Sequence, residues 1–356
     1  MKKSFLYISL IFTVILLASC SSVKENYYDY EGTSIQLFHV PADLDDSEKQ
    51  LTTITKYAEN LNGRKIFIDQ GHGGADRKNK SPNGEVVEAD VNLRVALYLK
   101  NFLERAGAKV YMSRLEDETV DLKYRSELLN STEAELFISV HHNAPAKPEQ
   151  NYVNYTSTYY HAKEKDYEYD HMARDVARYV QRDLSFAMNT SGGLGSFDGT
   201  YSDYLIYPGE GFSVLRLADV PAILIECAFF TNPLEEKRLA SEKFNEVQAW
   251  AIFKGLGKYY MNSHPVVKLL EEESTLTDNS LKLVLQIDDE NEIDESSIAV
   301  MVNKEKYDFT FDSSENKLEV VIENVEEGDH EIKVLCKNSK KRFSYPFRKQ
   351  FEVKFD

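Results

Sequence analysis

The sequence predicts an α/β domain followed by a small all-β domain. Between residues 65 and 260, short apolar runs typical of strands alternate with amphipathic helical stretches. The runs LFISV and AILIE are apolar throughout, as expected for strands that are buried on both faces of a sheet. After Pro265 the helical signals stop, and alternating strands follow at roughly ten-residue spacing. We therefore expect an open twisted sheet with helices on both faces, followed by a small Ig-like β-sandwich.

The start of the chain has the features of an export signal. Two lysines precede a short apolar run at residues 5–18, which is too short for a typical membrane span. The sequence Leu-Ala-Ser-Cys that follows resembles a lipobox, and this resemblance implies that Cys20 is lipidated. An ordinary signal peptide and a transmembrane anchor are the alternatives. We expect a signal peptide at residues 1–19 and a polar tether at residues 20–46.

The elements of the α/β domain follow from periodicity and from helix-stop signals. Residues 47–62 are weakly amphipathic and predict a helix with Ser47 as its N-cap. Gly107 ends a clear amphipathic helix, because glycine commonly takes the left-handed position after the last turn. We expect strands at residues 65–69, 108–114, 135–143, 155–161 and 221–230, and helices at residues 89–107, 122–132, 164–188 and 233–260.

The all-β region shows no chemistry of its own. His330 stands between two acidic residues, which indicates a solvated turn rather than a metal site. The role of this region remains open: it could hold substrate, contact a partner or space the preceding domain from its anchor. We expect its strands at residues 281–287, 298–302, 307–311, 318–322, 331–336 and 350–354.

Charge and cysteine usage exclude some classes of function. The chain has 42 Lys and Arg against 59 Asp and Glu, a net charge of −17. Loss of the two lysines in the signal leaves 40 against 59, or −19, which argues against a nucleic-acid partner. Of three cysteines, Cys227 and Cys336 remain after Cys20 and fall in different predicted domains, so we expect no disulfide framework. Cys227 follows Glu226 on a strand and is expected to be a buried, inert thiol on the opposite face.

Four residues in separate segments carry the chemistry: His72, Glu88, His141 and Glu226. Two histidines and one glutamate can hold a catalytic Zn²⁺ and leave a fourth position open. A second carboxylate nearby can then act as general base on water. His141 and Glu226 lie near the ends of predicted strands, where open α/β sheets place their sites.

The segments around these residues resemble the zinc-dependent N-acetylmuramoyl-L-alanine amidases, often called the amidase 3 family. The resemblance extends from about residue 64 to residue 260 and rests on IDQGHGG, VVEADVNL, AKVYMSR, FISVHHNA and PAILIECAFFTNP. It implies that His72, Glu88 and His141 are the zinc ligands and that Glu226 is the catalytic carboxylate. It also implies cleavage between N-acetylmuramic acid and L-alanine of the stem peptide. Gln70 departs from the family pattern, in which proline usually precedes Gly-His.

Alternatives remain for individual ligands. Glu85 competes with Glu88 as a carboxylate ligand, and His142 competes with His141. Asn143 and Arg216 are weak candidates for substrate contacts. We interpret Arg114, Arg125 and Arg216 as structural ion-pair residues, and contact with a peptide carboxylate is the alternative for Arg216.

Two further segments have open interpretations. Residues 152–169 are rich in tyrosine and either stack against sugar faces or form ordinary half-buried structure. Residues 196–210 are longer than in minimal family members, and we hypothesise a mobile flap over the zinc cleft.

The sequence therefore predicts a zinc amidase domain at residues 47–263 and an accessory β-domain at residues 264–356. We expect an exported protein, lipid-anchored to a bacterial membrane and facing the cell wall in the periplasm or at the cell surface. It would act on peptidoglycan in wall remodelling or cell separation. A protein activator or wall-associated partner could bind the accessory domain. The rival functions are another zinc peptidase or amidase acting on cell-wall peptides, and a non-catalytic wall-binding lipoprotein.

Overall fold

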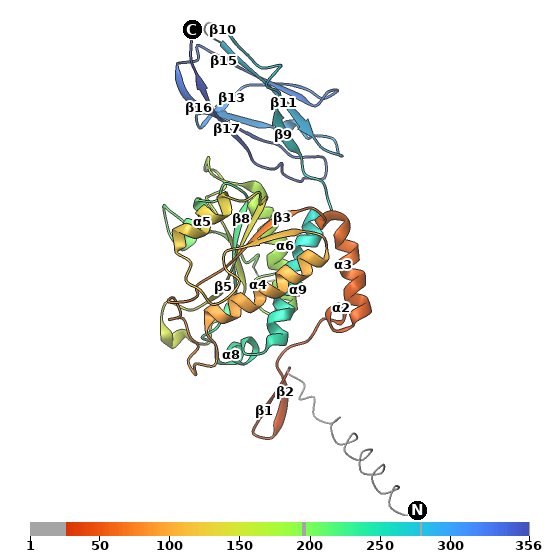
Figure 1. Ribbon diagram of the computed structural model, residues 1–356, viewed down its shortest axis with the longest axis vertical. Coiled ribbons are helices and arrows are strands. Elements are labelled where there is room, and N and C mark those ends of the chain that lie inside the picture. Colours follow the sequence, from red (N-terminus) through yellow and green to blue (C-terminus); the bar gives the residue numbers. More distant parts are fainter. Residues whose placement is uncertain (1–25, 194–196, 278–279, 356) are drawn as a thin grey trace, which may run out of the picture.

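The computed structural model describes residues 26–193, 197–277 and 280–355. The predicted signal peptide and Cys20 lie outside these residues. No helix within the described ranges is both long enough and apolar enough to cross a membrane. The chain forms a helix-rich body and, beyond it, an all-β body (Figure 1).

A mixed sheet forms the centre of the helix-rich body, in the order β4-β3-β5-β8-β6-β7. The first four strands are mutually parallel, whereas β6 runs antiparallel to β8 and β7 runs parallel to β6. The carboxyl ends of β3, β5 and β8 therefore lie at one end of the sheet. The strands are β3 (Lys65–Gln70), β4 (Lys109–Met112), β5 (Leu136–Asn143), β6 (Ser157–Tyr160), β7 (Thr200–Ser202) and β8 (Ala222–Phe229).

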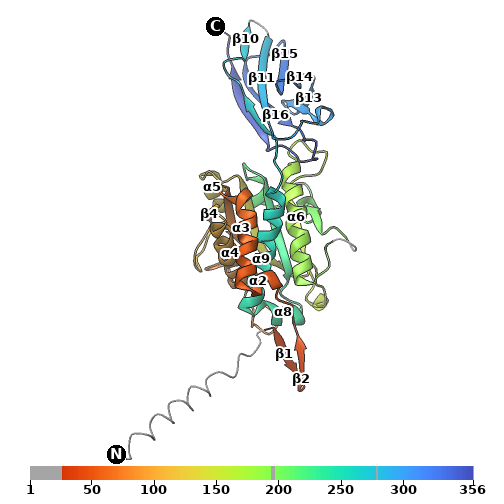
Figure 2. The same cartoon turned by 90° about the vertical axis from the view of Figure 1, so that its right-hand side faces the viewer.

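Helices cover both faces of this sheet, as expected. On one face α3, α4, α6 and α9 pack over the largest apolar cluster, and Figure 2 shows α3, α9 and α6 side by side. On the other face α5 and α7 cover a smaller cluster that includes Phe67 and Phe137. The helices are α2 (Ala42–Asp45), α3 (Ser47–Leu61), α4 (Glu88–Arg105), α5 (Leu122–Asn130), α6 (His171–Met188), α7 (Ser213–Arg216), α8 (Pro233–Leu239) and α9 (Glu242–Tyr260), with 3₁₀ turns η1 (Pro148–Gln150) and η2 (Asp203–Leu205).

Capping residues explain where the helix boundaries differ from expectation. Asp46, not Ser47, caps α3 by accepting hydrogen bonds from the backbone N–H groups of Glu48 and Lys49. The helix expected from residue 164 starts only at His171, because the side chain of Asp170 caps it. The helix expected over residues 233–260 is divided into α8 and α9, since Ser241 caps a new helix.

The segment expected to be a tether is partly folded. β1 (Tyr27–Tyr30) and β2 (Thr33–Gln36) form an exposed hairpin. Residues 37–46 then pack on the body: Leu37, Phe38 and Leu44 are buried in the largest apolar cluster. Asp43 accepts hydrogen bonds from Trp250 and Lys254 at 3.1 and 2.6 Å. The expectation of an unstructured tether to residue 46 is therefore wrong for these residues, because their apolar side chains complete the core.

The all-β body has two antiparallel sheets around one apolar core. The single strand expected at residues 307–311 is divided: residue 307 ends β13, and residues 310–311 begin β14, which belongs to the other sheet. The sequence did not predict β9 and β10. The strands are β9 (Val266–Leu269), β10 (Thr275–Thr277), β11 (Ser280–Asp288), β12 (Ala299–Val302), β13 (Glu305–Tyr307), β14 (Thr310–Asp312), β15 (Lys317–Glu323), β16 (Gly328–Leu335) and β17 (Phe347–Val353), with 3₁₀ turn η3 (Glu295–Ser297).

The two bodies meet at the amino ends of the parallel strands. Arg64, just before β3, donates a hydrogen bond to the Tyr345 hydroxyl at 2.8 Å. The hairpin β1–β2 lies at the opposite end, where the Tyr28 ring lies beside Lys237 of α8. Lys237 in turn binds Glu85, in the loop between β3 and α4, at 2.7 Å. The carboxyl ends of the strands thus face the hairpin and point away from the β-domain (Figure 1).

Candidate metal centre

Three side chains from three separate elements converge at the carboxyl end of the sheet. His72 follows β3, Glu88 begins α4, and His141 lies near the end of β5. His72 Nε2 lies 3.2 Å from one Glu88 oxygen, and His141 Nδ1 lies 3.2 Å from the other. Within the described ranges, this trio is the group of histidine, cysteine and acidic residues whose ligand atoms all lie within 4.8 Å of one another.

The turn after β3 places His72 under conformational strain. His72 has φ of 62°, a left-handed backbone conformation that is uncommon for residues other than glycine. Arg125 holds this turn by donating hydrogen bonds to the carbonyl oxygens of Gln70 and His72, at 2.8 and 3.0 Å. Arg125 also forms a buried ion pair with Asp69 at 2.6 Å. The expectation of a structural ion pair for Arg125 is therefore confirmed.

Arg114 supports the same turn in a different way from the ion pair that we expected. It donates hydrogen bonds to the backbone carbonyl oxygens of Gln70, Gly71 and Ala89. Because Ala89 belongs to the first turn of α4, this guanidinium ties the His72 turn to the helix start that carries Glu88.

Uncharged hydrogen-bond donors hold the Glu88 carboxylate in place. Asn79 donates to Oε2 at 2.7 Å, whereas Asn92 and the backbone N–H of His142 donate to Oε1 at 3.2 and 3.1 Å. Burial alone would raise the pKa of Glu88, but its hydrogen bonds with His141 and His72 outweigh burial and hold the pKa well below its ordinary value. Glu88 is thus a buried, ionised carboxylate.

The two competing candidates have other partners. Glu85 binds Lys237 on the surface. His142 is buried on the opposite side of β5, between Asn92 Oδ1 at 2.8 Å and Gln248 Nε2 at 2.9 Å. Burial lowers the pKa of His142 to about 4, so this imidazole is neutral. These placements leave His141 and Glu88 beside His72.

Glu226 lies directly across from His141 on the neighbouring strand β8. Its Oε2 atom is buried and has no hydrogen-bond partner among the described residues. Burial raises the pKa of Glu226 well above its ordinary value, and the charge of Glu88 adds to this effect while His72 opposes it. Cys227, the next residue, lies in the core on the other face, and burial raises the pKa of its thiol well above the ordinary value. The expected inert thiol is confirmed.

The donor set fits zinc. Bonds of about 2.1 Å in tetrahedral geometry place ligand atoms roughly 3.4 Å apart, close to the 3.2 Å between Glu88 and each histidine. The outer nitrogen of His72, Nδ1, lies 2.7 Å from the Asp76 carboxylate. A carboxylate on the second ring nitrogen is the usual support of a metal-binding histidine.

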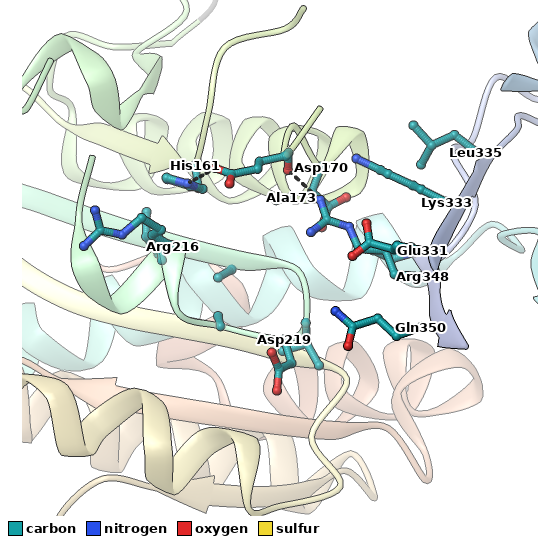
Figure 3. Close-up of a pocket in the computed structure, with 16 residues that line it drawn as sticks. His161, Asp170, Ala173, Arg216, Asp219, Glu331, Lys333, Leu335, Arg348 and Gln350 are labelled. Atoms are coloured by element: carbon teal, nitrogen blue, oxygen red, sulfur yellow. Dashed lines mark hydrogen bonds and ion pairs between the residues drawn. The ribbon is translucent and has the colours of Figure 1, made fainter. Parts of the chain in front are cut away.

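The weak substrate candidates are placed differently from each other. The Asn143 side chain accepts the N–H of Ala144 at 2.8 Å and so shapes the loop at the site end of β5. Arg216 lies at the other end of the sheet and lines a cavity of about 540 Å³ between the two bodies. Figure 3 shows it beside His161, across the cavity from Lys333 and Arg348. The Arg216 guanidinium lies 3.7 Å from the Glu210 carboxylate, which agrees with the expected ion pair. The alternative, contact with substrate at the zinc site, is not supported by its position.

The proposed flap over the cleft is also placed differently. Ser196 lies outside the described residues. Residues 200–202 form β7, which pairs with β6 and continues toward the β-domain end of the sheet. Asp203 is buried there and lies 2.9 Å from His161 Nδ1. Most of the described part of this insertion is thus packed structure at the far end of the sheet rather than a flap. Phe197 is the part that lies near the site.

Sequence reasoning missed the residues that support the ligands. Asn92 had a signal, because it follows Glu88 by four residues on a helix and therefore lies on the same face. Asp76 and Asn79 lie in a polar loop, and the composition of the loop does not predict which way their side chains point. Gln248 comes from α9, more than one hundred residues from its partner His142.

Exchange of Gly71 for alanine is expected to weaken metal binding. A Cβ at this position would overlap the imidazole ring of His141, so the ring would have to leave its place beside Glu88. We expect zinc affinity to fall by roughly 10- to 100-fold, as for other disturbed ligand supports, measured by chelator competition. Gly84→Ala is the control for backbone strain in the loop that follows, because its φ of 73° disfavours alanine while a Cβ there meets nothing within 4 Å. Equal affinity in both variants would contradict this interpretation of the turn.

Fold and site together define an α/β protein in which two histidines and a glutamate could hold a metal ion beside a buried carboxyl group. Metal-dependent hydrolases use this kind of arrangement. A family model described as N-acetylmuramoyl-L-alanine amidase matches residues 66–258, more than half of the chain. The chain therefore belongs to this family, and the protein is an enzyme that hydrolyses an amide bond of peptidoglycan. The resemblance read from the sequence motifs is confirmed.

The chain is also similar to individual amidases and to a solved amidase structure. The germination-specific N-acetylmuramoyl-L-alanine amidase of Bacillus subtilis is 31% identical over 215 residues, which cover 56% of this chain and 81% of that protein. The amidase AmiC of Neisseria meningitidis is 32% identical, over 57% of this chain and 54% of its own length. A solved amidase structure from Clostridium difficile is 32% identical, covers 56% of this chain and 97% of that chain, and has a TM-score of 0.48.

Proposed function

We propose that the protein is a zinc-dependent amidase that cleaves the bond between N-acetylmuramic acid and L-alanine of the stem peptide, in wall remodelling or cell separation. One observation carries the zinc dependence: the ligand atoms of His72, Glu88 and His141 lie within 4.8 Å of one another, beside the buried carboxyl of Glu226. Two imidazoles and one carboxylate form a common ligand set of catalytic zinc.

In this proposal His72, Glu88 and His141 hold the metal. Bound zinc would supply Lewis acidity, which polarises a carbonyl group and brings the pKa of water near 7. Asp76 keeps the His72 ring oriented through Nδ1, and Asn79 and Asn92 keep the Glu88 carboxylate from rotating. These supports hold the ligands in place before binding, which lowers the cost of organising the site.

Glu226 is proposed to move the proton. Its unpartnered Oε2 accepts a proton from the attacking water and returns it to the nitrogen of the departing L-alanine. Burial and the Glu88 charge raise its proton affinity, which favours the acceptance step. A cation held by His72, Glu88 and His141 would oppose this rise and would favour the ionised form of Glu226 that is needed before each turnover.

Zinc affinity is expected to rise with pH up to about 9. Burial lowers the pKa of His72, but hydrogen bonds and charges from Glu88 and Asp76 outweigh burial and raise the pKa to about 9 in the metal-free protein. Zinc binds the neutral ring, so below this pH binding must release a proton. We expect about a tenfold gain in affinity for each pH unit between 7 and 9. Calorimetry in buffers of different ionisation enthalpy checks this expectation, and an affinity independent of pH would contradict it.

We further propose that Cys20 carries a lipid and anchors the protein to a bacterial membrane, with residues 1–19 removed and the catalytic domain at the cell wall. The names of the relatives support a wall-associated location. Residues 264–356 are proposed to be an Ig-like accessory domain that contacts a wall-associated partner or activator. One solved relative, the CwlD amidase of Clostridioides difficile, is in complex with the GerS lipoprotein.

Digestion of purified sacculi with the protein lacking residues 1–20 tests the function. We expect release of intact stem peptides that begin with L-alanine, and we expect a chelator to stop it and zinc to restore it; mass spectrometry reads the products. Shortened stems that remain attached to sugar would indicate a peptidase instead. Sacculi that are bound but not cleaved by the folded, zinc-loaded protein would indicate the wall-binding alternative.

A further inference from the structure

A group of aromatic side chains lies beside the metal centre, on the outer strands of the sheet. Tyr155 precedes β6, and Phe197 and Tyr201 come from the segment around β7. The Phe197 ring stacks on Tyr201 with centroids 6.1 Å apart and meets Tyr155 edge-on at 6.0 Å. We call these three residues the aromatic wall.

The register of the sheet places this wall next to Glu226. Ser157, two residues after Tyr155, pairs directly with Glu226 across the antiparallel strands β6 and β8. Tyr159 pairs with Tyr201 on the next strand outward, and the two rings lie 6.1 Å apart. Because side chains alternate along strands, Glu226, Tyr159 and Tyr201 share one face of the sheet. Glu226 and Tyr201 are separated by two strand spacings across the sheet and by two residues along it, or about 12 Å in all.

The wall is supported from behind and open in front. Phe229 and Tyr159 are 2% exposed and pack against Tyr155 and Tyr201, respectively. Phe197 is 36% exposed, and Tyr155 and Tyr201 are half-buried. The flanking charge of Asp198 is matched by Arg178 at 3.1 Å. The wall therefore presents rigid, uncharged aromatic faces.

We propose that the aromatic wall binds sugar rings of the peptidoglycan glycan strand and so positions the N-acetylmuramic acid side of the scissile bond at Glu226. This inference rests on the proposed amidase function. Each substrate has a neutral sugar on one side of the bond and a peptide with free carboxylates on the other. Sugar rings present C–H faces that pack on aromatic rings, whereas a peptide terminus calls for a cation.

The test compares the double variant Phe197→Ala/Tyr201→Ala with the wild-type protein. Phe186→Ala is the matched control, because Phe186 is an 87% exposed aromatic residue on α6, which covers the opposite face of the sheet. The first probe is glycan chains stripped of their stem peptides, titrated by calorimetry. We expect about tenfold weaker binding for the double variant and unchanged binding for the control.

Kinetics on peptide-bearing glycan strands give the second measurement. We expect KM to rise about tenfold in the double variant while kcat changes by less than about twofold, since Glu226 and the ligands are untouched. Unchanged zinc content and thermal unfolding show that the variant is folded. Equal glycan binding by wild type and double variant would overturn the proposal, as would weaker binding of free stem peptides alone.

The glycan titration also separates this inference from the amidase assignment. If the wild-type protein binds stripped glycan through the aromatic wall but releases no stem peptides, the amidase function is contradicted. The proposal that the aromatic wall binds sugar rings would still stand. If the double variant releases stem peptides with an unchanged KM, the proposal that the aromatic wall binds sugar rings is overturned. The amidase function would still stand.

Discussion

Replacement of Glu226 by glutamine is expected to reduce amide hydrolysis by about 10²- to 10⁴-fold while zinc content and stability stay close to those of the wild type. Glutamine has nearly the same shape but cannot take up a proton. The carboxyl group of Glu226 is buried, and its Oε2 atom has no hydrogen-bond partner among the described residues. Glu226 pairs with His141 on the neighbouring strand. The loss is therefore expected in kcat rather than in KM.

The measurement is stem-peptide release from sacculi, with zinc determined on the same sample. Glu85→Gln is the matched control, since Glu85 is the nearby carboxylate that binds Lys237 on the surface. We expect this control to retain full activity. A Glu226→Gln protein with wild-type kcat would remove Glu226 from its proposed role, whereas loss of zinc would show that it supports the ligands instead.

Removal of the Arg125 guanidinium is expected to have the largest effect on stability. Its side chain is 5% exposed and that of its partner Asp69 is 1% exposed. Burial alone would raise the pKa of Asp69, but Arg125 lowers it below the ordinary value. Arg125→Met would leave this ionised carboxylate buried without a cation, at a cost of about 3–5 kcal/mol. The midpoint of thermal unfolding should fall by roughly 10 °C.

The double variant Asp69→Asn/Arg125→Met separates charge from support of the turn. Removal of both charges should restore most of the stability, because neither group is then left unpaired. Zinc affinity should stay about tenfold weaker, since the His72 carbonyl has still lost its donor at 3.0 Å. Recovery of both stability and zinc affinity would mean that Arg125 does not hold the His72 turn.

The α/β core could be predicted because it depends on local pattern. The strand around LFISV and the helix that ends before Gly107 were expected from apolar runs and a stop signal, and both are present as β5 and α4. The ligand trio could be predicted because each residue adjoins such an element. The resemblance to the family favours His141 over His142, because the first histidine of the pattern is the ligand there. In the structure His142 lies against Asn92 and Gln248, away from His72 and Glu88.

Features that depend on distant parts of the chain could not be predicted in the same way. Residues 37–46 have tether-like composition, yet Leu37 and Phe38 enter a core built by helices two hundred residues away. The position of Arg216 depends on the turn taken after β7, and nothing in the local sequence fixes that direction. The helix stop near residue 240 depends on Ser241, a cap that also occurs within ordinary helices.

The opposite placement of the β1–β2 hairpin and the β-domain has a consequence for where the enzyme can work. With Cys20 lipidated, the seven residue steps to Tyr27 extend over at most about 25 Å. The hairpin and the metal centre would then stay close to the bilayer, while the β-domain projects away from it. An enzyme held in this way would act on the layers of the wall nearest to the membrane that carries the anchor.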